Sequence, residues 1–219
     1  MLVTDPGETI EFLLKSEFMH VLGAGMNTEK PANSAINELS ERGWNPIPVH
    51  PHDAGASIAG YPIRPNIEDG VTTDIVVIFL SPERARETVK RLLIKNYGSS
   101  PVIWFQHGAE DGITEGWLDD AGWQYVKNDC IVRFLERHDL SREPKKIPWF
   151  KQVQRDDDSG CSVWSVHDYK ENSDKSETEL EWIGDLRDLE LSNLPIPKYI
   201  RSLANQGESL ESCARRLAN

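Results

Sequence analysis

The stretch from residue 18 to residue 37 limits the possible folds more than any other part of the chain. It reads FMHVLGAGMNTEKPANSAIN. Its short apolar run at 18–22 predicts a buried strand, Gly23-Ala24-Gly25 predicts a turn, and a helical pattern begins near Asn33. A strand, a glycine turn and a helix start bring backbone N–H groups and a helix N-terminus to one place, which suits a bound phosphate. The sequence therefore predicts an anion-binding loop directly after the first strand.

The same alternation of short strands and helices continues along the chain. Strands are expected at residues 18–22, 44–49, 74–80, 102–105 and 123–126, and helices at residues 33–42, 82–96 and 111–121. The segment 74–80 reads DIVVIFL, a nearly continuous apolar run that is typical of a strand covered on both faces. The pattern predicts an α/β fold: a Rossmann-like three-layer domain with a parallel sheet of about five strands.

Residues beyond position 139 follow a different pattern. We expect residues 1–139 to form the Rossmann-like domain and residues 140–219 to form a C-terminal α+β extension with a hairpin and short helices. Within the extension we expect a linker at 141–146, paired strands at 160–169 and 179–182, and helices at 198–206 and 209–217. Trp164 and Trp182 make this segment too apolar for a free tail, so we expect it to pack on the protein or to form a homodimer.

Composition excludes several classes of protein. A formal net charge of −12 disfavours nucleic-acid binding, which needs a basic face. Cys130, Cys161 and Cys213 form no CxxC pair, so we expect no disulfide framework, no zinc site and a cytoplasmic location. Asp156-Asp157-Asp158 is interpreted as a solvated turn rather than a metal site. No signal peptide is apparent, and no apolar run approaches the roughly 20 residues of a membrane span.

The end of the second predicted strand bears on which nucleotide the loop would take. An NAD site needs a third small residue, which would fall on Thr28, and a carboxylate after the second strand. The chain has His50-Pro51-His52 there, and imidazoles can donate hydrogen bonds to a phosphorylated ribose. An NADP-type oxidoreductase therefore stays an alternative. So does the simpler interpretation that the glycines only make a turn and the histidines are solvated.

Six segments in order resemble a known family. They are VLGAGMNTEKPANSAINEL, IPVHP, GYPIRPNIED, DIVVIFLSPE, VIWFQHGAED and NDCIV. They are similar to the small CoA-binding domain proteins, stand-alone Rossmann-like proteins related to the CoA-binding domain of succinyl-CoA synthetase α subunits. The resemblance covers residues 8–136 and does not extend to residues 140–219.

The resemblance implies a ligand and a set of binding residues. The ligand is coenzyme A or an acyl-CoA. The implied binding residues are Gly23, Ala24, Gly25, Met26, Asn27, Lys30, Pro31, Ser34, His50, Pro51, His52, Phe79, Ser81, Gln106 and Gly108. His50 replaces the family's usual asparagine and His52 stands where a lysine is common, so the contact to the 3′-phosphate would weaken as pH rises.

Catalysis is not indicated by these residues. His107, after the fourth strand, is interpreted as a loop residue rather than a base, and Cys130 as a small apolar residue rather than a reactive thiol. The sequence therefore predicts a CoA-binding protein without evident catalysis. The alternative from another class is a regulatory module that senses CoA or a nucleotide and acts through its C-terminal arm.

Overall fold

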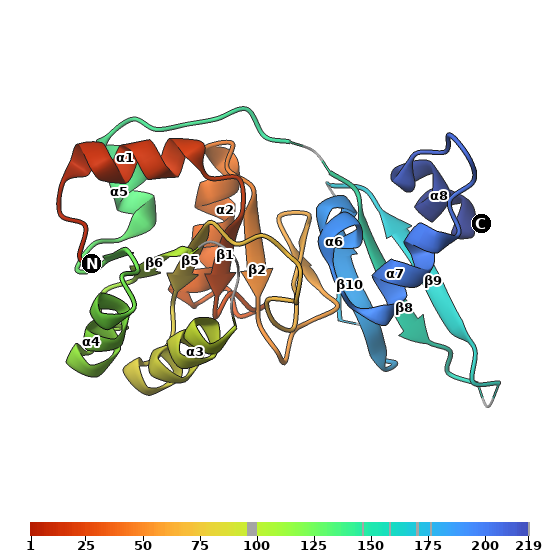
Figure 1. The fold of residues 1–219 in the computed structure, drawn as a ribbon. Coiled ribbons are helices and arrows are strands. Elements are labelled where there is room, and N and C mark those ends of the chain that lie inside the picture. The colour runs from red at the N-terminus through yellow and green to blue at the C-terminus, as the bar shows by residue number, and fades with distance from the viewer. Residues whose placement is uncertain (96–99, 146, 158, 170, 176, 219) are drawn as a thin grey trace. The chain divides into compact units, whose positions relative to one another are not determined.

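The structure is a computed structural model that describes residues 1–95, 100–145, 147–157, 159–169, 171–175 and 177–218. Three expectations therefore extend outside the described residues: the end of the helix at 82–96, the end of the linker at 141–146, and the last residue of the turn at 156–158. Figure 1 shows the order of the elements.

The N-terminal part contains the predicted parallel sheet. Its strand order is β2-β1-β5-β6-β7, and β1, β5, β6 and β7 pair in parallel. The strands are β1 (Met19–Leu22), β2 (Pro46–Val49), β5 (Ile75–Ile78), β6 (Val102–Phe105) and β7 (Tyr125–Val126). Every residue of these five strands is buried, because helices cover the sheet on both faces. The predicted Rossmann-like α/β fold is confirmed.

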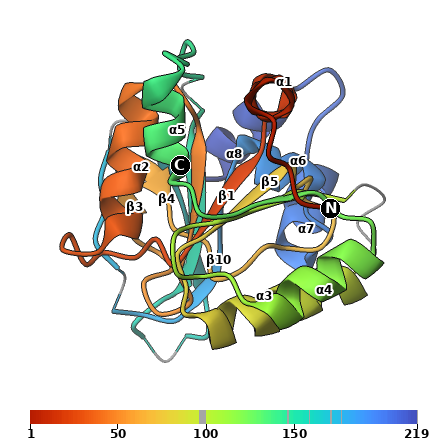
Figure 2. The ribbon, with the colours of Figure 1, turned by 90° about the vertical axis from the view of Figure 1, so that its left-hand side faces the viewer.

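Five helices pack around this sheet. They are α1 (Pro6–Lys15), α2 (Pro31–Glu41), α3 (Pro82–Ile94), α4 (Gly112–Asp120) and α5 (Ile131–Arg137). In Figure 2, α2 and α5 lie on one side of the sheet while α3 and α4 lie on the other. Proline at the first helical position begins α1, α2 and α3, since its fixed φ suits a helix start. For this reason α2 starts at Pro31, two residues before the expected start at Asn33.

The chain forms two compact units. The first consists of residues 1–24, 28–46 and 72–144, and the second of residues 25–27, 47–71 and 145–219. A two-stranded antiparallel ribbon, β3 (Ser57–Ile58) with β4 (Tyr61–Pro62), lies in the second unit. Residues 64–69 form no helix, and Arg64 makes a parallel bridge to Val49.

The C-terminal residues of the second unit build a three-stranded antiparallel sheet in the order β10-β8-β9. These strands are β8 (Trp149–Gln154), β9 (Ser162–His167) and β10 (Leu180–Asp185), and three helices follow: α6 (Leu186–Leu191), α7 (Pro195–Ser202) and α8 (Leu210–Leu217). The expected direct pairing of residues 179–182 with residues 160–169 is wrong. The unpredicted strand β8 lies between them, because its WFKQVQ sequence supplies ladder partners on both edges.

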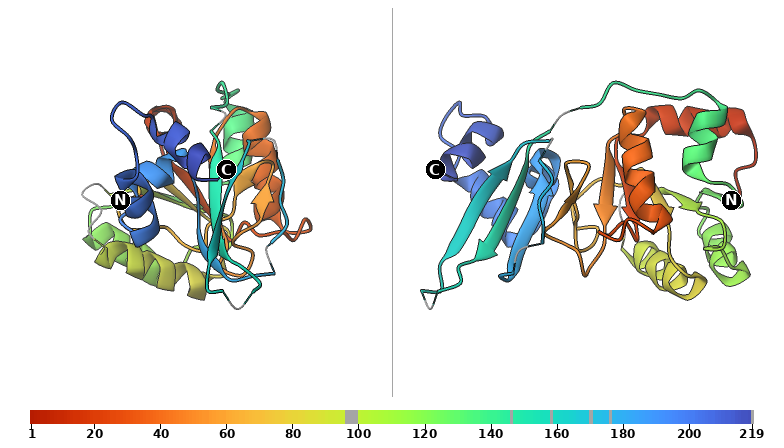
Figure 3. Two further views of the ribbon diagram at one scale, coloured as in Figure 1. Left: turned by 90° about the vertical axis from the view of Figure 1, so that its right-hand side faces the viewer. Right: turned by 180° about the vertical axis from the view of Figure 1, so that it is seen from behind.

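Helices α6, α7 and α8 cover one face of that sheet, as Figure 3 shows. The buried core under them is formed by Phe150, Trp182, Leu189, Ile200 and Ala214. Trp164 stacks between Phe150 and Trp182, with ring centroids 5.6 and 5.7 Å away. The apolar surface that argued against a free tail is thus buried within the unit by its own helices.

Candidate functional site

The predicted site residues of the first unit follow strands that end in register. Leu22 of β1 pairs with Ile78 of β5, and Ile78 pairs with Phe105 of β6. Gly23, Phe79 and Gln106 each come directly after one of these strand ends. They therefore lie along the carboxyl edge of the sheet, where ligands bind in open α/β folds.

Glycine is required at the first position of the loop. Gly23 has a φ of +91°, and a Cβ placed on it would lie 2.7 Å from the carbonyl oxygen of Phe79. Both the backbone conformation and this close approach exclude larger residues. Ala24, the next residue, is fully buried. The turn thus packs against the neighbouring strand end while the chain turns toward α2.

The N-terminus of α2 carries features that favour an anion. No acidic residue lies in its first turn, and within the described part of the chain the side chain of the N-cap residue Lys30 makes no capping hydrogen bond. Pro31 and Ser34 are exposed in the first turns, and Ser34 Oγ donates a 3.1 Å hydrogen bond to the Pro31 carbonyl. The first turn itself therefore adds no carboxylate to the partial positive charge of this helix end, although Glu29 directly precedes the N-cap.

Gln106 has a buried side-chain amide nitrogen without a hydrogen-bond partner among the described residues. The residue is only 6 % exposed. A buried amide nitrogen without a partner is costly, and such groups commonly meet a ligand or water. Ser81 is the exposed N-cap of α3, and Gly108 is exposed with a φ of +85°.

The second unit brings together the loop residues 25–27 and the end of β2. The Met26 N–H donates to Asp53 Oδ2 at 2.8 Å, and the same oxygen lies 3.0 Å from His50 Nδ1. A Cβ on Gly25 would lie 2.2 Å from that oxygen, so Gly25 leaves the space that the Asp53 carboxylate occupies. Asp53 was not among the predicted site residues. The sequence signal that could have identified Asp53 is its position three residues after His50, within reach of that imidazole.

The remaining predicted residues of this unit are exposed. His52, Pro51, Met26 and Asn27 all face solvent, and the rings of His50 and His52 lie 6.0 Å apart at a steep angle. The two histidines are therefore neighbours at the end of β2, as the sequence predicted. The two units thus divide the predicted residues: the chain passes from the first unit to the second between Ala24 and Gly25.

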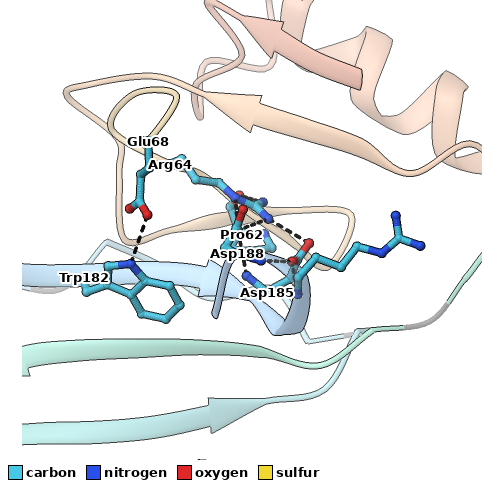
Figure 4. Close-up of polar contacts among 7 residues, drawn as sticks. Pro62, Arg64, Glu68, Trp182, Asp185 and Asp188 are labelled. Carbon is cyan, nitrogen blue, oxygen red and sulfur yellow. Dashed lines mark hydrogen bonds and ion pairs between the residues drawn. The ribbon is translucent and has the colours of Figure 1, made fainter. Parts of the chain in front are cut away.

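A buried ionic cluster, formed by Arg64, Glu68, Asp185 and Asp188, lies in the second unit (Figure 4). Arg64 Nη2 donates to Asp188 Oδ2 at 2.6 Å and to Asp185 Oδ2 at 2.9 Å. Its Nη1 donates to the Pro62 carbonyl at 2.6 Å, and its Nε donates to Asp188 at 2.9 Å. Asp185 and Asp188 also form the capping box that begins α6.

Charge within this cluster is unbalanced: two carboxylates pair with the one guanidinium, and Glu68 adds a third carboxyl group that contacts Trp182 instead. Burial raises the pKa of Asp188 to about 7, although Arg64 pulls that pKa downward. Burial likewise raises the pKa of Glu68, whose Oε2 accepts a 3.3 Å hydrogen bond from Trp182 Nε1. The cluster therefore holds a proton more readily than isolated carboxylates would.

Arg64 also joins this cluster to the predicted site through its backbone. The Arg64 N–H donates to the Pro48 carbonyl at 2.9 Å, and the His50 N–H donates to the Arg64 carbonyl at 2.9 Å. The end of β2 is thus held by a residue whose side chain is fixed by α6. No group of three or more metal-ligating side chains is found among the described residues, and none of their helices is long and apolar enough to cross a membrane.

The parallel sheet with helices on both faces defines a Rossmann-like α/β class of protein. The family described as CoA binding domain matches residues 19–135, and the chain belongs to this family. No curated protein matches the chain.

Solved structures support the fold. A structure described as a PH1109 protein redesigned for binding is 24% identical, with a TM-score of 0.55 over 65% of this chain and 97% of that one. A hypothetical protein from Pyrococcus horikoshii OT3 is 26% identical, with a TM-score of 0.54 over 61% of this chain and 92% of that one. A Thermus thermophilus protein is 23% identical, with a TM-score of 0.54 over 61% of this chain and 98% of that one.

Proposed function

We propose that the protein binds coenzyme A or an acyl-CoA and that it does so without catalysing a reaction on it. The observation that carries the proposal is membership of the CoA-binding domain family over residues 19–135. The residues present are compatible with that ligand, because the first turn of α2 carries no acidic residue and the Gln106 Nε2 lacks a partner within the described residues. Both features suit a ligand that carries phosphates and hydrogen-bond acceptors.

Roles for the candidate residues follow from their places in the fold. In the first unit, Gly23 and Ala24 with Lys30, Pro31 and Ser34 would meet the diphosphate, while Phe79, Ser81, Gln106 and Gly108 would line the rest of the edge. In the second unit, Gly25, Met26 and Asn27 would continue the loop, and His50, Pro51 and His52 would face the phosphorylated ribose. CoA would supply a thiol for acyl groups, and these residues would hold its nucleotide end.

A ligand comparison tests the proposal against its alternatives. Thermal unfolding is measured with CoA, acetyl-CoA, NADP and NAD at equal concentrations. Stabilisation by the CoA species alone is expected, because a ligand that binds only the folded state raises its stability by mass action. Stabilisation by NADP but by neither CoA species would replace this function with the NADP-type alternative.

A single substitution tests the position of the diphosphate. Ser34→Asp adds a negative charge to the first turns of α2, where it favours the helix but repels a phosphate. We expect CoA affinity to fall about tenfold with no loss of thermal stability. Lys90→Gln, an exposed change on α3 with the same change in net charge, is the matched control. Unchanged CoA affinity in Ser34→Asp would show that this helix end is not the phosphate site.

A further inference from the structure

The loop that follows β2 is held by the C-terminal segment of the second unit. Ser57 N–H donates to the Ser173 carbonyl at 3.0 Å, and Ser173 N–H donates to Ser57 Oγ at 2.7 Å. Gly60 N–H donates to Asn172 Oδ1 at 2.9 Å. These contacts join residues more than 110 positions apart in sequence, so residues 171–173 run beside the loop in a fixed register.

Lys175 extends from this segment to the end of the loop that bears the histidines. Its Nζ donates a 2.7 Å hydrogen bond to the carbonyl oxygen of His52. That bond uses one of three ammonium protons and leaves the charge exposed beside the His52 backbone. Lys175 forms no ion pair with any carboxylate in the described part of the chain, although Asp174 precedes it and Asp53 pairs with His50.

In a protein with a net charge of −12, an anionic ligand has to be met by individual cations at the site, and the Lys175 ammonium is one that no carboxylate pairs with in the described part of the chain. In Rossmann-like domains the end of the second strand faces the ribose of the adenosine, and a cation near it accommodates a ribose phosphate. Lys175 lies at that strand end, although it is more than 120 residues away in sequence, because residues 47–71 and 145–219 belong to the same compact unit.

We propose that Lys175, with His52, binds the ribose phosphate of the ligand, which makes the C-terminal segment a specificity-determining part of the nucleotide site. This inference rests on the proposed function and identifies the ligand as a nucleotide with a ribose phosphomonoester, the 3′-phosphate in CoA. An ammonium donates to a phosphate through charge-assisted hydrogen bonds, which are stronger than neutral ones.

The test compares CoA with dephospho-CoA, which lacks only that phosphate, by titration calorimetry. Lys175→Gln is expected to weaken CoA by about tenfold, a typical effect of one hydrogen bond between charged groups, and to change dephospho-CoA affinity by less than about twofold. Lys175→Arg, which keeps the charge, is expected to retain most of the preference for CoA. Lys198→Gln, at an exposed position of α7, is the control with the same change in charge.

Each outcome decides a separate question. Equal losses for both ligands in Lys175→Gln would show a structural role for the segment and would overturn the inference, as would unchanged affinities. If wild type binds CoA and Lys175→Gln prefers CoA over dephospho-CoA as strongly as wild type does, the inference is refuted and the proposed function stands. A wild-type protein that binds neither ligand refutes the proposed function as well. Lys175 is exposed, so thermal stability in the absence of ligand should match wild type in both variants.

Discussion

Replacing Arg64 by methionine removes the only guanidinium of the buried ionic cluster as the structure describes it. The Arg64 side chain is 3% exposed, and those of Asp188 and Asp185 are 7% and 18% exposed. Methionine fills much of the same volume, so the substitution isolates the loss of charge and hydrogen bonds from the loss of packing. Asp185 and Asp188 would then stay buried without their cation.

The size of the effect follows from the burial of the partners. Arg64 supplies donors to Asp188, to Asp185 and to the Pro62 carbonyl. Removing one member of a buried ion pair costs about 3–5 kcal/mol, because the remaining charge is left without compensation in a medium that solvates it poorly. We therefore expect Arg64→Met to lower the free energy of unfolding of the second unit by about 3–5 kcal/mol at pH 8.

The cost should depend on pH. Burial raises the pKa of Asp188 to about 7, so at pH 5 this carboxyl carries a proton and needs no cation. We expect the cost of Arg64→Met to be smaller at pH 5 than at pH 8 for that reason. Arg64→Lys keeps the charge but cannot donate to both carboxylates in a planar fork, so its cost should be intermediate.

Urea unfolding, followed by tryptophan fluorescence, measures these free energies, and amide hydrogen exchange assigns the loss of protection to residues of the second unit. Arg155→Met, an exposed change in the same unit, should shift stability by less than about 0.5 kcal/mol. A cost for Arg64→Met that matches this control, or that is equal at pH 5 and pH 8, would contradict the interpretation of the cluster.

Two further predictions concern Asp188 and Gly25. A carboxyl whose pKa is higher in the folded than in the unfolded chain stabilises the fold most below about pH 4, and this contribution is lost as pH rises through about 7. Wild type should therefore lose stability relative to Asp188→Asn between those pH values in urea unfolding; a constant difference would argue against a raised pKa. Gly25→Ala should displace Asp53 from Met26 and His50 and cost about 1–3 kcal/mol, and adding Asp53→Ala should cost less than the sum of the two single changes. Additive costs in that double-mutant cycle would show that Asp53 is not the group displaced.

The parallel sheet and its carboxyl edge could be predicted because the signals are local. Residues 75–78 are apolar without interruption, and Gly23 follows a strand and precedes a helix. The pairing partner of residues 179–182 could not be predicted in the same way. Strand β8 reads WFKQVQ, which shows no regular alternation over its six positions, so its partners on both edges decide its structure.

Arg64 shows the same limit within the candidate site. Its neighbours Pro65 and Asn66 are typical of a turn, yet its side chain is buried by carboxylates more than 120 residues away. Asp53 was missed because its role depends on the loop at residues 25–27. The boundary placed at residue 139 stays a prediction, whereas the contacts in the structure group residues 47–71 with residues 145–219.

That grouping gives the proposed anion site local support within an acidic chain. Two histidines and a few cations must be held near the end of β2, because long-range attraction is unfavourable at a net charge of −12. The C-terminal segment supplies that support: Arg64 is fixed by Asp185 and Asp188, and Lys175 reaches the His52 carbonyl. Fixing the backbone of a loop residue costs about 1–2 kcal/mol in conformational entropy. These contacts offset part of that cost and hold the loop backbone in place. The extension is therefore best understood as part of the structure that shapes the ribose end of the proposed site.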